Sequence, residues 1–194
     1  INAANQKGLS PEDRARIMLP GLWARYYEIR KTGGNDFLFS AIIDTWRRNV
    51  KDPELKLNYG CLLSVVLSEI DIDLKGAEKV NNEMKGLAER TDNISLSLKV
   101  WNARGLTAMQ KKDWQEAIRI FNSAERFLTP PETHKFPDAL QYLGNTLNNR
   151  GFAKLNLSDE VDQKKKRDLI SSAIVDLWNA EDLYMKVVPP PLKH

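Results

Sequence analysis

The chain has 194 residues, a formal net charge of +3 and 42% hydrophobic residues, which is ordinary for a folded domain with a sizeable core. Its 29 basic and 26 acidic residues are well mixed, so no strong charge excess favours nucleic acid as a ligand. Apolar runs reach only about seven residues, far below the roughly 20 that a membrane-spanning helix needs. We therefore expect a single domain over residues 1–194 that does not insert into a membrane.

The single cysteine, Cys61, lies in the apolar run CLLSVVL. A lone thiol cannot form an internal disulfide, and these neighbours favour a buried structural residue. Such a thiol fits a reducing compartment, so we expect this fragment to be cytoplasmic. No signal peptide is visible. Because the chain begins at Ile1 and not at Met, we expect that it is a fragment and that a targeting segment or anchor could lie outside it.

Helix-period patterns run through the first ninety residues and β-branched runs are scarce, which predicts an all-α fold. After a short lead-in, Ser10-Pro11 begins the first helix as its cap and first helical residue. Pro20-Gly21 predicts a break or a kink in that helix. An aromatic-rich segment from Leu22 to about Lys31 follows, and Gly33-Gly34 ends it.

Two acidic residues predict the next helix starts. Asp36 caps a third helix that ends near Val50. Asp52-Pro53 starts a fourth helix, which is apolar around most of its circumference and is expected to be the most buried.

A fifth helix is expected from about Asp73 to Arg90. With the fourth helix it could form a divergent hairpin, in which Gly60 and Ala77 allow the backbones to approach closely. Asn81 departs from that pattern, because it occupies a position where the hairpin needs a large apolar residue.

Residues 101–130 predict two helices joined by a tight turn. The first is capped by Asp92 and carries one stripe of residues at i, i+4 and i+7: Trp101, Gly105 and Ala108. Asp113 caps the second helix, whose apolar face is formed by Ala117, Ile118, Phe121, Ala124 and Leu128. The small residues at 105 and 117 let the two backbones approach closely.

The C-terminal part begins with a loop over 129–137, whose three prolines exclude a helix. A helix over about 138–155, a polar connector over 157–167 and a last helix over about 166–187 follow. Three prolines then end the fold, so residues 188–194 are expected to form an extended tail. The whole chain should contain about eight or nine helices.

Two stretches share a motif. In the first, Trp101-x2-Arg104-Gly105-x2-Ala108 is followed by Ala117-x3-Phe121-x2-Ala124 and Pro130. In the second, NARGL of residues 102–106 recurs as NNRGF of residues 148–152, with Ala173-x3-Leu177-x2-Ala180 as the partner helix. Both stretches resemble the tetratricopeptide repeat (TPR), whose pattern is W-x2-L-G-x2-Y followed by A-x3-F, Ala and Pro.

The resemblance implies an α-solenoid of antiparallel helical hairpins. Its parts would be divergent helices over 10–90, one hairpin over 92–130 and a second hairpin over 138–187 with an extended connector. Arg104 and Arg150 stand where the family has an apolar residue between helices. We expect each arginine to extend to solvent or to pair with an acid on a neighbouring helix.

The resemblance also implies a concave groove, lined by the first helix of each hairpin, that binds an extended peptide or a partner helix. In this chain, that face would present Lys99, Asn102, Leu106, Met109, Asn145, Asn148, Asn149 and Phe152. Asparagine suits peptide recognition because one amide can both donate and accept hydrogen bonds. The clamp for chaperone tails known in some family members needs several basic residues, so one lysine on this face argues against that specialisation.

No catalytic constellation is apparent. His134 lies in the proline-rich loop, His194 is the last residue, and Cys61 has no partner base. No Cys/His cluster has the spacing of metal ligands. The basic run Lys164–Arg167 is expected to be part of a solvated connector. We expect no enzymatic activity and no cofactor.

The sequence thus predicts a protein-interaction scaffold or adaptor. Two alternatives remain open. One is a nucleic-acid-binding helical repeat, against which the balanced charge argues. The other is a self-associating structural module, in which another copy occupies the groove or the aromatic face of Trp23–Tyr27 and the chain is a homo-oligomer.

Overall fold

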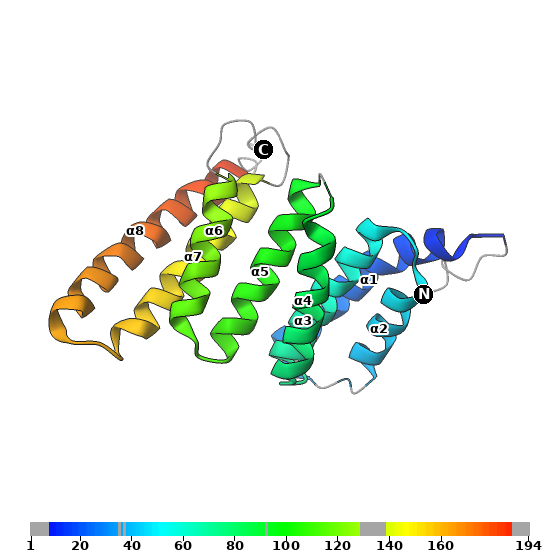
Figure 1. Cartoon of the computed structure of the whole chain (residues 1–194), viewed down its shortest axis with the longest axis horizontal. Helices are drawn as coiled ribbons and strands as arrows, with labels where there is room; N and C mark the ends of the chain where they lie inside the picture. The colour runs from blue at the N-terminus through cyan, green and yellow to red at the C-terminus, as the bar shows by residue number, and fades with distance from the viewer. Residues whose placement is uncertain (1–7, 35, 37, 92, 129–138, 188–194) are drawn as a thin grey trace, which may run out of the picture. The chain divides into compact units, whose positions relative to one another are not determined.

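A computed structural model describes residues 8–34, 36, 38–91, 93–128 and 139–187. The described residues form eight helices and no strand, so the predicted all-α class is confirmed (Figure 1). The helices are α1 (Pro11–Thr32), α2 (Phe39–Asn49), α3 (Pro53–Glu69), α4 (Leu74–Ala88), α5 (Ile94–Gln110), α6 (Trp114–Leu128), α7 (Ala139–Ser158) and α8 (Gln163–Val187). Within these ranges, no helix is both long and apolar enough to cross a membrane.

The chain divides into two compact units, residues 1–103 and residues 104–194. The division falls inside α5, so the first part of this helix belongs to one unit and the last part to the other. The predicted single domain stays a prediction. The loop over 129–137 and the tail over 188–194 lie outside the described residues, as do His134, His194 and Pro130.

Short polar side chains begin the helices where the sequence predicts it. Each side-chain oxygen accepts a hydrogen bond from a backbone N–H that has no partner within the helix. The pairs are Ser10 with Asp13 at 3.1 Å, Asp52 with Glu54 at 2.8 Å, Asp73 with Gly76 at 2.9 Å, and Asp113 with Glu116 at 3.1 Å. The predicted cap of α5, Asp92, is not described. The amide oxygen of Asn93 accepts from the N–H of Leu96 at 3.2 Å.

Helix α1 continues through Pro20 and Gly21, so the predicted break is wrong, whereas a kink at this point stays a prediction. Proline removes one N–H from the helix, so the carbonyl of Arg16 loses its usual partner. Pro20, Gly21 and Arg16 are all exposed, so water can hydrate that carbonyl at little cost. The helix continues because Leu22 and other residues of its second half are buried.

Two other boundaries differ from prediction. Helix α2 begins at Phe39, later than the predicted start directly after the cap Asp36, whose carbonyl accepts from the N–H of Phe39 at 2.9 Å. The predicted connector over 157–167 is mostly helical, because α7 extends to Ser158 and α8 begins at Gln163. The basic run Lys164–Arg167 therefore lies in the first turns of α8.

Helix α3 is the centre of the first unit and packs against α1, α2 and α4. It is buried nearly all round, as predicted, and its fully buried residues include Leu57, Tyr59, Leu62 and Val66. The hydroxyl of Tyr59 donates to the carbonyl of Ala15 on α1 at 2.8 Å, which satisfies the only polar atom of a buried aromatic side chain. In the second unit, α7 packs against both α6 and α8.

Candidate interaction site

Small residues face larger ones where two helices of a pair approach. A Cβ added at Gly105 would overlap the ring of Phe121 on α6. One added at Gly151 would lie 2.9 Å from Leu177 on α8, and 3.2 Å from a backbone oxygen of the same helix. The absence of a side chain at these glycines therefore sets the distance between the helices. The predicted close-approach role of Gly105 is confirmed.

In the pair α3 and α4, a polar contact takes the place of the glycine contacts just described, again between a small residue of the first helix and a larger residue of the second. Asn81, four residues after the buried Ala77, accepts a hydrogen bond from the hydroxyl of Ser64 at 2.7 Å. This contact explains why a polar residue occupies an apolar position. Gly60, four residues before Ser64, is also a close-approach residue, because an added Cβ would overlap the side chain of Met84.

Arg150 joins three helices of the second unit. Its guanidinium donates to both carboxylate oxygens of Asp176 on α8, at 2.8 and 2.6 Å. It also donates to Asn122 at 2.9 Å and forms an ion pair with Glu125, both on α6. Burial alone would lower the pKa of Arg150, but its hydrogen bonds with the two carboxylates outweigh burial and raise this pKa. The expectation that Arg150 pairs with an acid is confirmed.

Lys154 completes this network one turn further along α7. Its ammonium lies 2.7 Å from Asp176 and donates to Ser172 at 2.6 Å. The indole N–H of Trp114 on α6 donates to Glu160 at 2.9 Å, beyond the end of α7. These contacts hold α7 between α6 and α8, and so they determine which face of α7 reaches solvent.

Arg104, at the matching position of α5, also lies near an acid. The pKa of Glu116 on α6 is lowered, chiefly by its hydrogen bond with Arg119 and in smaller part by the charge of Arg104. This proximity agrees with the expected acidic neighbour on the adjoining helix.

The solvent face of α7 contains part of the predicted binding set. Asn148 is exposed, and 53% of Phe152, one turn later, is exposed. Asn149 is half-buried. The amide oxygen of Asn145 accepts from the hydroxyl of Tyr184 on α8 at 2.7 Å. Of these four residues, Asn148 and Phe152 therefore form the most accessible pair.

The predicted residues on α5 are half-buried, and they fall in both units. Lys99 donates to the amide oxygen of Asn58 on α3 at 2.8 Å, so its charge lies against the first unit. Asn102 belongs to the same unit, whereas Leu106 and Met109 belong to the second. The ligand-binding role of all eight residues stays a prediction.

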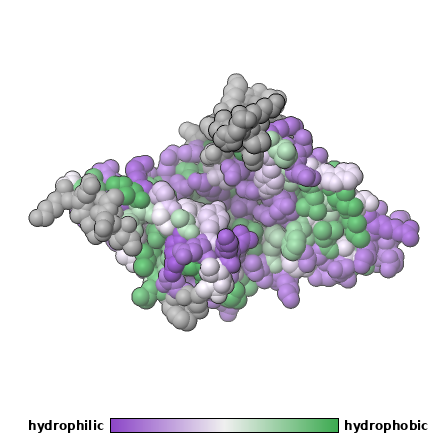
Figure 2. Space-filling view, turned by 180° about the vertical axis from the view of Figure 1, so that it is seen from behind, coloured by the Kyte–Doolittle hydropathy of each residue, from purple (hydrophilic) through white to green (hydrophobic). Residues whose placement is uncertain are grey.

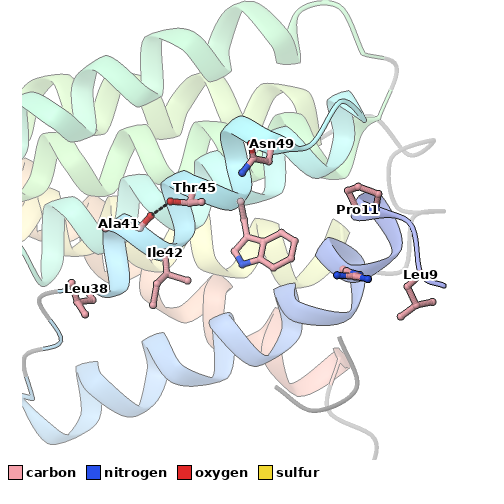
Figure 3. Close-up of a pocket in the computed structure, with 9 residues that line it drawn as sticks. Leu9, Pro11, Leu38, Ala41, Ile42, Thr45 and Asn49 are labelled. Atoms are coloured by element: carbon pink, nitrogen blue, oxygen red, sulfur yellow. Dashed lines mark hydrogen bonds between the residues drawn. The ribbon is translucent and has the colours of Figure 1, made fainter. Parts of the chain in front are cut away.

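Sequence reasoning missed a groove in the first unit, between the start of α1 and one face of α2 (Figure 3). Its volume is about 900 Å³. The lining residues are Leu9, Pro11, Arg14, Leu38, Ala41, Ile42, Thr45, Trp46 and Asn49. The available signal was in α2, which is apolar on two faces: Phe39 and Ile43 are buried, whereas Leu38 and Ile42 are exposed. A helix that is apolar on two sides has two surfaces to cover.

The last helix also exposes large apolar side chains. They are Ile174, Val175, Trp178, Met185 and Val187. Figure 2 shows green hydrophobic surface at its right, in the part of the view that holds the C-terminal helices. Such a patch marks a surface that can associate with another protein.

The described residues include no group of three or more His, Cys, Asp or Glu side chains placed to hold a metal ion. Cys61 is buried, and its burial raises the pKa of the thiol to about 12. The expected absence of enzymatic activity and of a cofactor stays a prediction.

No protein-family model matches the sequence, and searches of curated proteins and of solved structures found no significant match.

Proposed function

We propose that this chain is a protein-interaction scaffold built from TPR-like helical hairpins. The observation that carries the proposal is the shared register of three helix pairs: α3 with α4, α5 with α6, and α7 with α8. In each pair, the second helix carries a fully buried alanine. The residue four positions after that alanine contacts a small residue of the first helix. The three contacts are Ser64 with Asn81, Gly105 with Phe121, and Gly151 with Leu177.

The alanines of this register are Ala77, Ala117 and Ala173, and all three are completely buried. Three copies of one contact support antiparallel hairpins that repeat along the chain as an α-solenoid, because a repeat buries its faces only against its neighbours. The copy in α3 and α4 lies within the first ninety residues, where the sequence resembles the family only in its helical periodicity. The lone buried thiol fits a reducing compartment, and we propose the cytoplasm.

The binding face that we propose includes the solvent side of α7. Asn148 can donate to one backbone group of an extended peptide and accept from the next. Phe152 adds an exposed aromatic ring, the kind of side chain that dominates the energy of many interfaces. The Arg150 network supports this face from the opposite side, so it is presented by a helix that is held in place.

A pull-down from cell extract with the whole chain tests the proposal. We expect a bound protein that is lost with an Asn148→Ala/Phe152→Ala variant. The matched control is Asn179→Ala/Val175→Ala on α8, which also removes one exposed amide and one exposed apolar side chain. Equal loss with both variants, or recovery of mainly nucleic acid that salt releases, would contradict the proposal.

The exposed apolar face of α8 favours a second candidate, a self-associating module. In that case, light scattering would show a mass that rises with protein concentration. Trp178→Glu would return the mass to that of one chain.

A further inference from the structure

The groove between α1 and α2 contains a cation with an unsatisfied donor. The Nε atom of Arg14 is buried and has no hydrogen-bond partner among the described residues. A buried donor without an acceptor costs folding free energy. Arg14 as a whole is only half-buried and lines the groove, so a carboxylate that enters the groove can pair with the charge of its guanidinium through a charge-assisted hydrogen bond.

Arg14 is also the only charged side chain among the nine residues that line the groove. Two neighbouring arginines already have acidic partners: Arg16 pairs with Asp52, and Arg48 pairs with Asp44. No ion pair within the described part of the chain includes Arg14. The groove therefore presents one positive charge in a mainly apolar wall, and its complement is an apolar surface with one negative charge.

The α2 side of the groove follows a helical stripe. Six of its residues contribute at i, i+3, i+4, i+7, i+8 and i+11, from Leu38 to Asn49 (Figure 3). At 1.5 Å per residue, this stripe is about 16 Å long, which matches about three turns of a second helix. The groove is open, since 69% of Leu38 and 43% of Ile42 are exposed. An open, helix-length surface suits a docking helix better than a small ligand, which is normally enclosed.

The floor of the groove is held in place before anything binds. The ring of Trp46 stacks on Tyr59 of α3, with centroids 6.4 Å apart and planes at 19°. Tyr59 is itself fixed by its hydrogen bond to Ala15. A floor that does not have to be ordered on binding reduces the entropic cost of docking a partner.

We propose that this groove binds an amphipathic helix of a partner protein, whose apolar side chains contact Leu38, Ile42 and Trp46 and whose Asp or Glu pairs with Arg14. This surface differs from the α7 face and lies in the other unit, so the inference goes beyond the proposed function. A helix laid into an apolar groove is a recurring mode of recognition, in which anchors at i, i+3, i+4 and i+7 supply the contacts.

The probe is a displayed library of helical peptides of about 15 residues, with a fixed leucine stripe at that spacing and Glu, Gln, Lys or Ala elsewhere. Selection against the whole chain should enrich Glu at one position beside the stripe. Fluorescence anisotropy of the selected peptide should show that Arg14→Gln weakens binding by about tenfold and that Ile42→Asp abolishes it.

Two controls separate the groove from general effects. Phe127→Asp on α6 introduces an aspartate at another exposed apolar position, outside the groove and the α8 patch, with 52% exposed against 43%, and should leave binding unchanged. The charge-reversed Arg14→Glu protein should prefer a peptide in which Lys replaces the enriched Glu. A change of preference cannot come from loss of folding.

Three outcomes would overturn the proposal. The first is selection of peptides without an acidic preference. The second is binding that Phe127→Asp weakens as much as Ile42→Asp does. The third is a chain that sediments as a dimer and that Ile42→Asp converts to a monomer, because the groove would then be filled by a second copy.

Discussion

At the scale of single residues, the ion pair of Arg150 and Asp176 is the most consequential contact of the second unit. Both side chains are buried, and the bond between them is bidentate. Buried charges cost several kcal/mol to desolvate, so they are tolerated only when their hydrogen bonds are nearly complete. Removal of one partner should therefore cost far more than removal of an exposed pair.

We predict that Arg150→Met lowers the free energy of unfolding by about 3–5 kcal/mol, because it leaves Asp176 buried with Lys154 as its remaining cation. Urea unfolding followed by circular dichroism measures this change. The control is Arg119→Met, which breaks an exposed pair with Glu116 and should cost less than about 1 kcal/mol. Equal costs for the two variants would show that the buried network adds nothing.

Cys61 predicts a dependence of stability on alkaline pH. Burial raises the pKa of this thiol from 9.0 to about 12, and the charge of Lys99 opposes the shift only in part. Between these two values, the unfolded chain has lost a proton that the folded chain keeps. The free energy of unfolding should therefore fall as pH rises from 9 towards 12, and it should be insensitive to this thiol below 9.

Cys61→Ala separates the thiol from other titrating groups. Burial also raises the pKa of Tyr59, from 10.0 to about 12, and its contribution to alkaline destabilisation remains in the variant. Urea titrations at several pH values give the free energy of unfolding of both proteins. Above pH 9, this free energy should fall more steeply with pH in the wild type than in the variant. Parallel slopes would mean that the Cys61 thiol titrates alike in the folded and unfolded chains.

At the scale of helices, two glycines with opposite surroundings test how packing sets the distance between elements. A Cβ at Gly21 would meet no heavy atom within 4 Å, whereas one at Gly105 would overlap the ring of Phe121. Glycine is also poor in a helix interior, where alanine is better by about 1 kcal/mol. At Gly21 only the helix propensity acts and it favours alanine, whereas at Gly105 the overlap with the ring of Phe121 opposes it.

We predict that Gly21→Ala raises the free energy of unfolding by about 1 kcal/mol. Gly105→Ala should lower it by about 1–3 kcal/mol, because the added methyl group forces α5 and α6 apart. Thermal and urea unfolding of both variants measure the difference. Stabilisation by Gly105→Ala would rule out the close approach of these two helices.

At the scale of the whole molecule, α5 is the element that the two units share. A continuous helix should couple their unfolding, as a shared interface does in repeat proteins. Ala103 lies at the division and is buried. A change there acts on the coupling element without touching the Arg150 network.

Ala103→Pro should cost about 3 kcal/mol or more and should separate the unfolding of α3 from that of α8. Hydrogen exchange at increasing urea, read at amides of both helices, would show one common transition in the wild type and two in the variant. Ala103→Gly keeps the N–H, costs about 1 kcal/mol and should retain one transition. A single transition in the proline variant would mean that coupling does not depend on α5.

The sequence by itself determined the helices and most of their starts. Caps such as Asp52 and Asp113 act on N–H groups two or three residues away, so their effect is visible in any short window. The same holds for the spacing of Gly105 and of the Ala117–Phe121 pair, because the period of a helix places such residues on one face. Local chemistry was enough for the all-α class.

Only the tertiary structure decided which faces are covered. Pro20 remains helical because its side of α1 is exposed, and Arg150 finds Asp176 across 26 residues of chain. The Nε atom of Arg14, beside an apolar stripe of α2, has no hydrogen-bond partner among the described residues. Each of these outcomes depends on side chains that are distant in sequence, so no local pattern contains it. The physical reason is that burial, and with it the cost or gain of every polar and apolar group, is a property of neighbours in space.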